Sequence, residues 1–399
     1  MKKLLLLGGD SLLIPVIKQA KKLGAYTITC DYLPDNIAHQ YSDEYVNFST
    51  TAKEEILDWA TENNIDGVLT FTDSGALTAA YIAEKLGLPY QCSYAAANIL
   101  QDKSLFRRFL KDHHFNCPEA RGYASYPEAK DELNYFRWPV IVKPVDSAGS
   151  KGVTKVNRSE DLEQAIDTAL SFSQKHQFII EEFLEKDTFS SGSEVFAING
   201  KIAFSGVYDQ CFDTDAVNPF IPSGEIWPSS LPKERIDEFH SELQRLFSLL
   251  GVTTGLFNVE FRVCKDGKLY IMEVSPRAGG NRLAEMLKFA THQDLIDAEV
   301  RRALSLDIPQ LHEAEYNGHF AILVLHSVKD GIFLDIELND EVKGNVIDLM
   351  VLKQQGDRVN AFAGANALIG TVFLKCDNRN KLTELIEAPA KWVTIKLKQ

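Results

Sequence analysis

Residues 257–280 read FNVEFRVCKDGKLYIMEVSPRAGG, in which two apolar runs flank the turn residues Lys265-Asp266-Gly267. Asp-Gly between two such runs is typical of a β-hairpin, so the segment predicts two paired antiparallel strands. Each strand carries one glutamate, and pairing would place Glu260 and Glu273 on the same face of the sheet. Apposed carboxylates repel each other unless a cation neutralises them, and their hard oxygen ligands suit Mg²⁺. A buried ion pair between Glu273 and Arg277 is the alternative interpretation.

Two lysines precede this hairpin in contexts that suit a polyphosphate. Lys103 lies on a helix predicted over Gln101–Lys111, and Lys143 ends an apolar strand that leads into DSAGSKG at 146–152. Glycines allow backbone N–H groups to turn inward around an anion, and the ammonium group adds a point charge. The P-loop pattern GxxxxGK[ST] is absent. Taken alone, the loop is also compatible with an ordinary turn, and Lys103 with a solvated helix face.

A further apolar strand, Phe178–Ile180, runs into the sequence Glu-Glu-Phe-Leu at 181–184. A strand that leaves a sheet offers an apolar slot and free backbone groups, which a nucleoside base requires. A strand that ends in surface charge is the alternative. The segment Pro219–Pro232 is rich in proline and predicts a loop.

The rest of the chain indicates an α/β protein of three parts. Strands at Leu4–Leu7, Tyr26–Cys30 and Gly67–Phe71 alternate with amphipathic helices, which predicts a Rossmann-like parallel sheet covered on both faces. Gly8-Gly9 lacks the third glycine of G-x-G-x-x-G, so a tight turn is preferred over NAD binding. After Pro309 short β-rich runs predict a further domain. The expected boundaries are 1–100, 101–308 with a lid at about 115–182, and 309–399.

Composition excludes several classes of protein. The formal net charge of −14 argues against a broad nucleic-acid surface, and no apolar stretch is long enough for a membrane span. The start MKKLLLLGGD has too short an apolar run for a signal peptide. Six cysteines without short pairings are most simply reduced thiols. A cytoplasmic protein is therefore expected.

The order of these motifs resembles the ATP-grasp superfamily. Lys103, Lys143 with its Ser/Gly loop, the Glu-Glu-Phe-Leu segment and the two glutamate strands occur in the family's order across roughly residues 100–308, and the flanking regions match its three-part layout. The resemblance implies a Rossmann-like N-terminal domain, an ATP-grasp fold of two α+β subdomains and a β-rich C-terminal domain. It also implies an ATP- and Mg²⁺-dependent carboxylate–amine ligase that forms an acyl phosphate and then a C–N bond.

The resemblance assigns roles to individual residues. Lys103 and Lys143 would contact the ATP phosphates, Lys143 and Arg277 would be catalytic, and Glu260 and Glu273 would hold Mg²⁺. The loop over the phosphates would use Ser147, Gly149, Ser150, Gly152 and Val153. The adenine hinge would comprise Glu181, Glu182, Phe183 and Leu184, and the ribose would contact Glu194, with Asp187 as the competing candidate.

One position departs from the family pattern. Ser275 stands where the family usually has asparagine in Glu-x-Asn-Pro-Arg, so Ser275 is a doubtful ligand for a second metal ion. Thr72, Asp73 and Ser74 are candidates for binding an amine, and Arg282 and Arg277 for binding a carboxylate. Helix caps or surface charges are the alternative roles for Thr72, Asp73, Ser74 and Arg282.

The resemblance leaves the substrates open. It favours a small-molecule carboxylate, such as an amino acid, with no nucleic acid or membrane as partner. A phosphoribosylamine–glycine ligase-like purine enzyme and a non-catalytic ATP-binding module are the alternatives. Related enzymes are often dimers, and no surface in the sequence identifies one.

Overall fold

The N-terminal part is a four-stranded parallel sheet. The computed structural model describes residues 1–398. The strand order is β3-β2-β1-β4, with β1 (Lys3–Leu7), β2 (Tyr26–Cys30), β3 (Glu44–Val46) and β4 (Gly67–Thr70). Leu4 and Leu6 pack toward α1 (Leu13–Lys22), whereas Leu5 and Leu7 pack toward α2 (Lys53–Glu62) and α3 (Asp73–Leu86). Helices thus cover both faces, as the alternation of strands and helices predicted.

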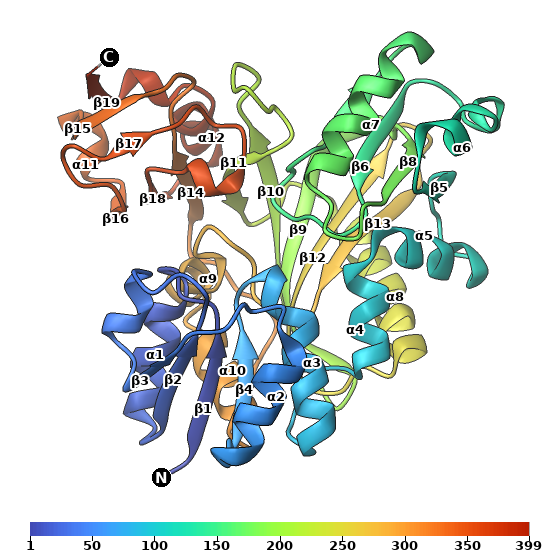
Figure 1. The fold of residues 1–399 in the computed structure, drawn as a ribbon. Helices are drawn as coiled ribbons and strands as arrows, with labels where there is room; N and C mark the ends of the chain where they lie inside the picture. Colours follow the sequence, from blue (N-terminus) through green and yellow to red (C-terminus); the bar gives the residue numbers. More distant parts are fainter. Residues whose placement is uncertain (399) are drawn as a thin grey trace.

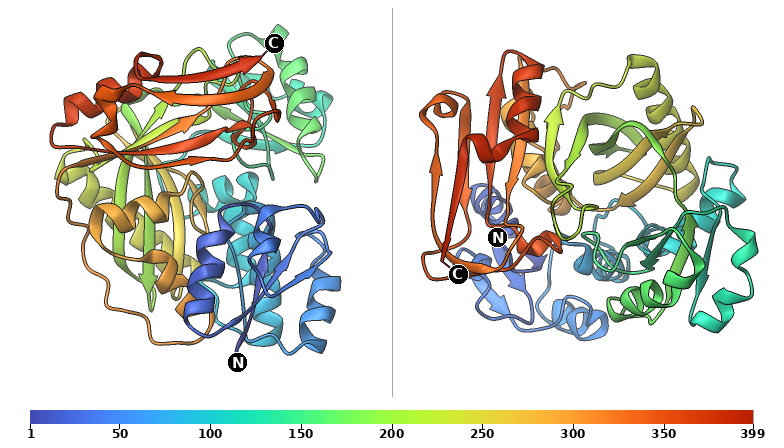
Figure 2. Two further views of the ribbon diagram at one scale, coloured as in Figure 1. Left: turned by 90° about the vertical axis from the view of Figure 1, so that its left-hand side faces the viewer. Right: turned by 90° about the horizontal axis from the view of Figure 1, so that it is seen from above.

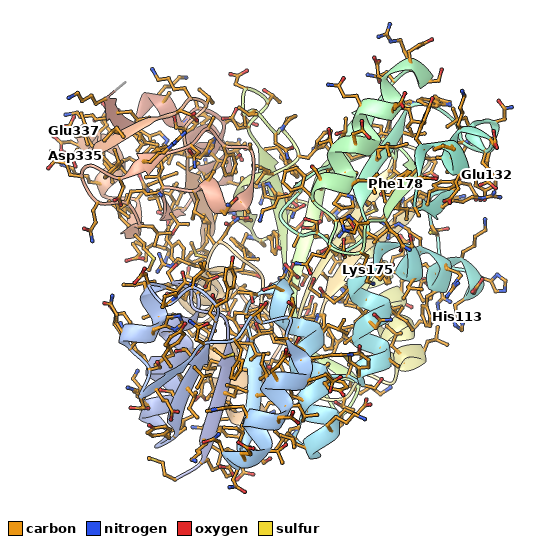
Figure 3. All side chains as sticks on the ribbon, in the orientation of Figure 1. His113, Glu132, Lys175, Phe178, Asp335 and Glu337 are labelled. Atoms are coloured by element: carbon orange, nitrogen blue, oxygen red, sulfur yellow. The ribbon has the colours of Figure 1, made fainter. Side chains whose placement is uncertain are left out.

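The second part is the lid sheet, an antiparallel sheet in the order β5-β8-β6-β7. Its elements are β5 (Ala120–Tyr123), α6 (Tyr126–Lys130), β6 (Val140–Pro144), β7 (Thr154–Val156), α7 (Leu162–Ser171) and β8 (Phe178–Glu182). Phe178 is fully buried below α7 (Figure 3). The helix expected at 101–111 is confirmed as α5 (Lys103–Asp112), but it begins later than expected. Gln101 ends a separate helix, α4 (Tyr94–Gln101), and the carboxylate of Asp102 caps α5 by accepting the Leu105 N–H.

The third part is the large sheet, with eight strands in the order β13-β12-β9-β10-β11-β14-β18-β16. These are β9 (Lys186–Ile198), β10 (Lys201–Phe212), β11 (Pro222–Trp227), β12 (Gly255–Cys264), β13 (Leu269–Ser275), β14 (His319–Leu325), β16 (Val346–Val351) and β18 (Gly370–Cys376). The predicted hairpin at residues 257–280 is confirmed as β12–β13. The loop expected at 219–232 was wrong, because it contains β11: Pro222 is the strand's first residue and Pro228 follows its last, so neither interrupts the ladder.

The C-terminal strands β14, β16 and β18 extend the large sheet (Figure 1). A small sheet of β15 (Gly331–Leu338), β17 (Arg358–Val359) and β19 (Val393–Lys398) completes this region with α11 (Asp340–Lys343) and α12 (Arg379–Glu387). Figure 2 shows the C-terminal strands and the lid sheet on the same side of the N-terminal sheet. The short β-rich runs that begin after Pro309 therefore do not start a separate sheet, since three of them continue the large sheet. The domain boundaries stay a prediction.

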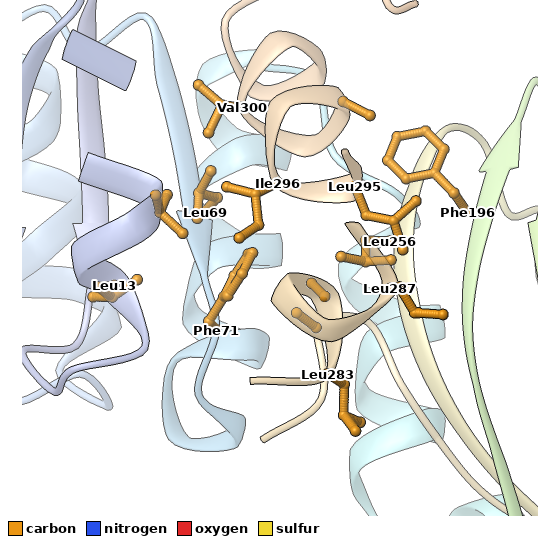
Figure 4. Packing of buried hydrophobic residues seen from close by; sticks show 14 of the residues in the cluster. Leu13, Leu69, Phe71, Phe196, Leu256, Leu283, Leu287, Leu295, Ile296 and Val300 are labelled. Carbon is orange, nitrogen blue, oxygen red and sulfur yellow. The ribbon is translucent and has the colours of Figure 1, made fainter. Parts of the chain in front are cut away.

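Helices α9 (Leu283–Thr291) and α10 (Leu295–Ala303) join the N-terminal sheet to the large sheet, while α8 (Lys233–Leu250) packs on the latter's other face. Leu69 and Phe71 approach Ile296 and Val300 of α10 from one side, and Leu256 of β12 lies on the other (Figure 4). Burial of each such side chain contributes about 1.5–3 kcal/mol. None of the helices in residues 1–398 has the length and apolar character needed to cross a membrane.

Candidate active site

The lid sheet and the large sheet line one cavity of about 340 Å³. Most residues that the motifs predicted for ATP and metal binding come together in its wall. These are Lys103, Lys143, Ser147, Gly149, Ser150, Val153, Glu181, Glu182, Phe183, Leu184, Glu260 and Glu273. Gly152, Glu194, Ser275, Arg277, Arg282, Thr72, Asp73 and Ser74 do not line it.

Glu260 and Glu273 lie directly opposite each other in the β12–β13 register. Burial and then the charge of Glu273 raise the pKa of Glu260, which is the expected result of two carboxylates sharing one site. Gln210 donates to Glu260 over 3.4 Å, and Lys103 Nζ lies 3.9 Å from Glu273. The alternative ion pair between Glu273 and Arg277 is not observed within residues 1–398.

The donor set at this site fits Mg²⁺. The described residues contain no group of three or more His, Cys, Asp and Glu side chains placed to hold a metal ion. Mg²⁺ commonly takes one or two carboxylates and completes its shell with waters and substrate phosphates. Glu260 and Glu273 face each other at the cavity wall and provide two such carboxylate ligands.

A buried charge cluster lies beside the glutamates. Glu181 contacts both Lys143 and Arg107, and its distance to Arg107 Nε is 2.9 Å. Burial opposes ionisation of Glu181, but the two cations outweigh it and lower its pKa to about 2. Burial lowers the pKa of Lys143 to about 8 despite Glu181. Glu181 therefore fixes the Lys143 ammonium at the cavity wall. Because its carboxylate is already paired with two cations, it is not free to bind the nucleoside base.

The glycine loop closes one side of the cavity. Lys103 Nζ donates to the Ser147 carbonyl over 2.8 Å, which ties α5 to this loop. Gly149 and Gly152 have φ of +66° and +71°, in the left-handed region that glycine adopts without strain. The Ser150 hydroxyl donates to the Phe220 carbonyl over 2.9 Å, so the loop also contacts the segment after β10.

The hinge after β8 has one free backbone donor. The N–H groups of Glu182 and Phe183 already donate to the carbonyls of Glu119 and Pro139, and the Glu182 carboxylate accepts from Arg137. Within residues 1–398 the Leu184 N–H forms no hydrogen bond, and Leu184 borders the cavity. The hinge can therefore recognise a base through the Leu184 backbone.

Arg277 pairs with Asp73 at the start of α3 in the N-terminal part. Its Nε and Nη2 donate to the two carboxylate oxygens over 2.9 and 2.6 Å, and the Ser275 hydroxyl donates to the same carboxylate over 3.1 Å. Burial opposes ionisation of Asp73, and Arg277 lowers its pKa. Since Nη1 also donates to Ala278, two of the five guanidinium N–H groups remain for a ligand.

Several predicted contacts lie elsewhere. Glu194 is fully buried in β9 and accepts from the Gly279 N–H and from Asn258, so the structure does not place it at a ribose; burial raises its pKa to about 7. Asp187 is exposed at the start of β9. Arg282 is paired with Glu285 and Asp348.

Thr72 is half-buried and Ser74 is exposed at the start of α3, and each already forms a hydrogen bond within the N-terminal part. Thr72 hydrogen-bonds with Thr70, and Ser74 accepts from Thr50.

The structure also adds residues to which the motifs assigned no role, among them Arg107, one turn after Lys103 on the predicted basic helix. Arg107 completes the charge cluster and donates to the Met272 carbonyl. Ile141 and Met272 border the cavity from the lid sheet and the large sheet, and Lys186 and Gln210 border it from β9 and β10. Alternation places Ile141 on the same face as Lys143, which is the signal that could have identified it. Met272 lies at the register shift between β12 and β13, so it borders the cavity beside Glu273 although the two residues are adjacent in the strand, and nothing in the sequence signals this shift.

Two lysines, a glycine loop and paired carboxylates around one cavity define a nucleotide-binding protein. Comparison with family models agrees: the ATP-grasp domain matches residues 136–285, and the ATP-grasp N-terminal domain matches residues 17–90. The chain belongs to the ATP-grasp superfamily, which confirms the resemblance drawn from the order of the motifs.

Relatives and solved structures extend this assignment. The chain is 28% identical over 281 residues to the carbamoyl phosphate synthase large chain, C-terminal section, of Methanocaldococcus jannaschii; the match covers 65% of this chain but only 42% of that protein. It is 26% identical over 328 residues to the formate-dependent phosphoribosylglycinamide formyltransferase of Parasynechococcus marenigrum, with 81% of each chain covered.

The fold is shared with two solved ligase structures. An L-amino acid ligase from Bacillus licheniformis has a TM-score of 0.82 at 20% identity, with 100% of this chain and 99% of that chain covered. A phosphoribosylglycinamide synthetase from Anaerococcus prevotii has a TM-score of 0.78 at 21% identity, with both chains fully covered. The predicted fold class is confirmed by this likeness.

Proposed function

We propose that this protein activates a small carboxylate as an acyl phosphate with ATP and then transfers the acyl group to an amine. The products would be an amide, ADP and phosphate. The observation that carries the proposal is the pairing of Glu260 with Glu273 in register at the wall that also holds Lys143 and the glycine loop. This arrangement concentrates positive and metal-binding groups where phosphate charge must be offset.

ATP would lie between the lid sheet and the large sheet. Its adenine would fit between Ile141 and Met272 and accept from the Leu184 N–H, while Lys103 and Lys143 would contact its phosphates. Glu260 and Glu273 would hold Mg²⁺, which when bound neutralises phosphate charge and orients the γ-phosphate.

The reaction would proceed in two steps. A carboxylate oxygen of the substrate attacks the γ-phosphorus, and the bond to the ADP oxygen breaks. Lys143 and the two free N–H groups of Arg277 stabilise the negative charge, and the glycine loop excludes water from the acyl phosphate. The amine nitrogen then attacks the carbonyl carbon, and phosphate leaves with the electron pair of the C–O bond.

The substrate is proposed to be a small carboxylate such as an amino acid. The structural likeness to an L-amino acid ligase supports an amino acid, and the likeness to a phosphoribosylglycinamide synthetase keeps a phosphoribosylamine acceptor as the second candidate. We also infer a cytoplasmic location, because all six cysteines are free thiols. The homodimer stays a prediction.

The test is phosphate release from ATP and Mg²⁺ with single amino acids, pairs of amino acids, bicarbonate and phosphoribosylamine plus glycine. Hydroxylamine added with each carboxylate would trap an acyl phosphate as a hydroxamate. Release that needs one carboxylate and one amine, and is lost in Glu273→Gln, supports the proposal. ATP binding without turnover for any combination would refute it in favour of a non-catalytic ATP-binding module.

A further inference from the structure

Glu225 is a buried carboxylate on the same face of the large sheet as Gln210. The two residues are paired across β10 and β11, so their side chains project from the same side. Glu225 is only 2% exposed. Its Oε1 accepts from Asn281 Nδ2 over 2.8 Å, whereas Oε2 has no hydrogen-bond partner within residues 1–398.

The free oxygen of Glu225 calls for a positively charged ligand. A buried carboxylate with one unpaired oxygen is costly to ionise, because that oxygen loses its water without gaining a donor. No lysine or arginine of the described chain forms an ion pair with Glu225, and burial together with the charge of Glu260 raises its pKa to about 8. Within residues 1–398, no group of three or more acidic, cysteine or histidine side chains is placed to hold a metal ion here. An ammonium group, which needs only hydrogen-bond acceptors, fits this oxygen better than a metal ion.

Glu225 is connected to the proposed reaction centre on both sides. Gln210, its cross-strand partner, donates a hydrogen bond to Glu260, which is one of the two carboxylates proposed to bind Mg²⁺. Asn281 follows Arg277 by four residues, and the intervening loop is fixed by Glu194, which accepts from the Gly279 N–H. Gln210 borders the cavity, so a ligand on Glu225 would lie about one strand spacing, roughly 5 Å, beyond the cavity wall at Gln210.

We propose that Glu225 binds the ammonium group of the acceptor amine through its free oxygen and holds this nitrogen beside the acyl phosphate. The inference rests on the proposed function and names the residue that recognises the second substrate. Glu225 takes one ammonium proton, and the nitrogen lone pair forms the C–N bond. The C–O bond to phosphate breaks, and the second amine proton leaves with the departing phosphate.

The test compares two nucleophiles in Glu225→Gln, which preserves shape and removes the charge. Hydroxylamine is neutral at pH 7 and needs no carboxylate to bind it, whereas an amino-acid acceptor arrives as an ammonium ion. We expect the KM for the amino acid identified in the substrate panel to rise at least tenfold. The ratio of amino-acid-dependent to hydroxylamine-dependent turnover should fall by at least the same factor. Glu242→Gln, on the outer surface of α8, controls for the substitution itself.

Three results would overturn the inference. One is a KM for the amino acid within twofold of wild type. Another is an equal loss with both nucleophiles, which would indicate a structural role. The third, no hydroxamate from wild type with any carboxylate, refutes the proposed function directly and this inference with it. If Glu225→Gln does not fold, Glu225→Asp is used instead, because it retains the charge but moves the carboxylate oxygen away from the bound ammonium group. The ratio of amino-acid-dependent to hydroxylamine-dependent turnover is then expected to be at least threefold lower than in wild type.

Discussion

Replacement of Glu225 by glutamine should make the unliganded protein more stable at high pH but not at low pH. Burial raises the pKa of Glu225 from 4.5 to about 8, so the folded protein holds this proton more tightly than the unfolded chain. The stability that comes from the neutral carboxyl is fully present below pH 4.5. It decreases as the pH rises and is lost once the pH has passed through about 8. Glutamine stays neutral at every pH, so the Glu225→Gln protein keeps this contribution to its stability.

The size of the effect follows from the pKa. At about 1.4 kcal/mol for each pH unit, the difference between 4.5 and 8 corresponds to at most about 5 kcal/mol. With an unfolding entropy of about 2.1 cal/mol/K per residue over 399 residues, that amount shifts Tm by about 6 °C. Thermal unfolding of both proteins without ATP should therefore show nearly equal Tm at pH 5, and Glu225→Gln several degrees higher at pH 9.

Glu242→Gln reports the effect of the same substitution at a surface ion pair with Arg245. If the Tm difference between wild type and Glu225→Gln stays within 1 °C from pH 5 to pH 9, Glu225 has a compensating partner in the folded protein. That result would refute the reasoning from its unpaired oxygen.

Three other substitutions test the site. Glu273→Gln should lower Mg²⁺-dependent phosphate release at least 100-fold at saturating ATP, because one of the two facing carboxylates is lost; an unchanged rate would remove Glu273 from the metal site. Arg107→Met leaves Glu181 with a single cation and should cost about 3–5 kcal/mol, seen as a lower urea midpoint, whereas an unchanged midpoint would contradict it. Arg277→Lys cannot keep the bidentate contact with Asp73, so kcat should fall at least tenfold while the KM for ATP changes less than threefold; an effect on KM alone would argue against it.

Local patterns in the sequence were sufficient where a site is built from neighbouring residues. The glutamate hairpin could be predicted because alternation and an Asp-Gly turn fix its register to within a residue. The loop of residues 147–153 was recognisable for a similar reason, since its conformation depends on its own glycines. These two segments supply one wall and the closing loop of the cavity.

Pairings between distant segments could not be read from the sequence. Asp73 and Arg277 are 204 residues apart, and nothing in either neighbourhood shows that α3 begins beside the end of β13. Glu225 was missed because the prolines around it suggested a loop, whereas β11 lies inside an eight-stranded sheet. The surroundings of Glu194 could not be predicted for the same reason, because its partner Gly279 comes from another part of the chain; its ribose role stays a prediction.

The serine at position 275 is better explained by this distant pairing than by lost activity. Its hydroxyl donates to the Asp73 carboxylate that also holds Arg277, so Ser275 and Arg277 together connect the glutamate strand to the N-terminal part. The paired glutamates, Lys143 and the free donors of Arg277 do not depend on an asparagine at this position. We therefore expect the departure from the family pattern to leave intact the charge arrangement that the proposed phosphoryl transfer requires, while Ser275 helps to hold Asp73 against Arg277.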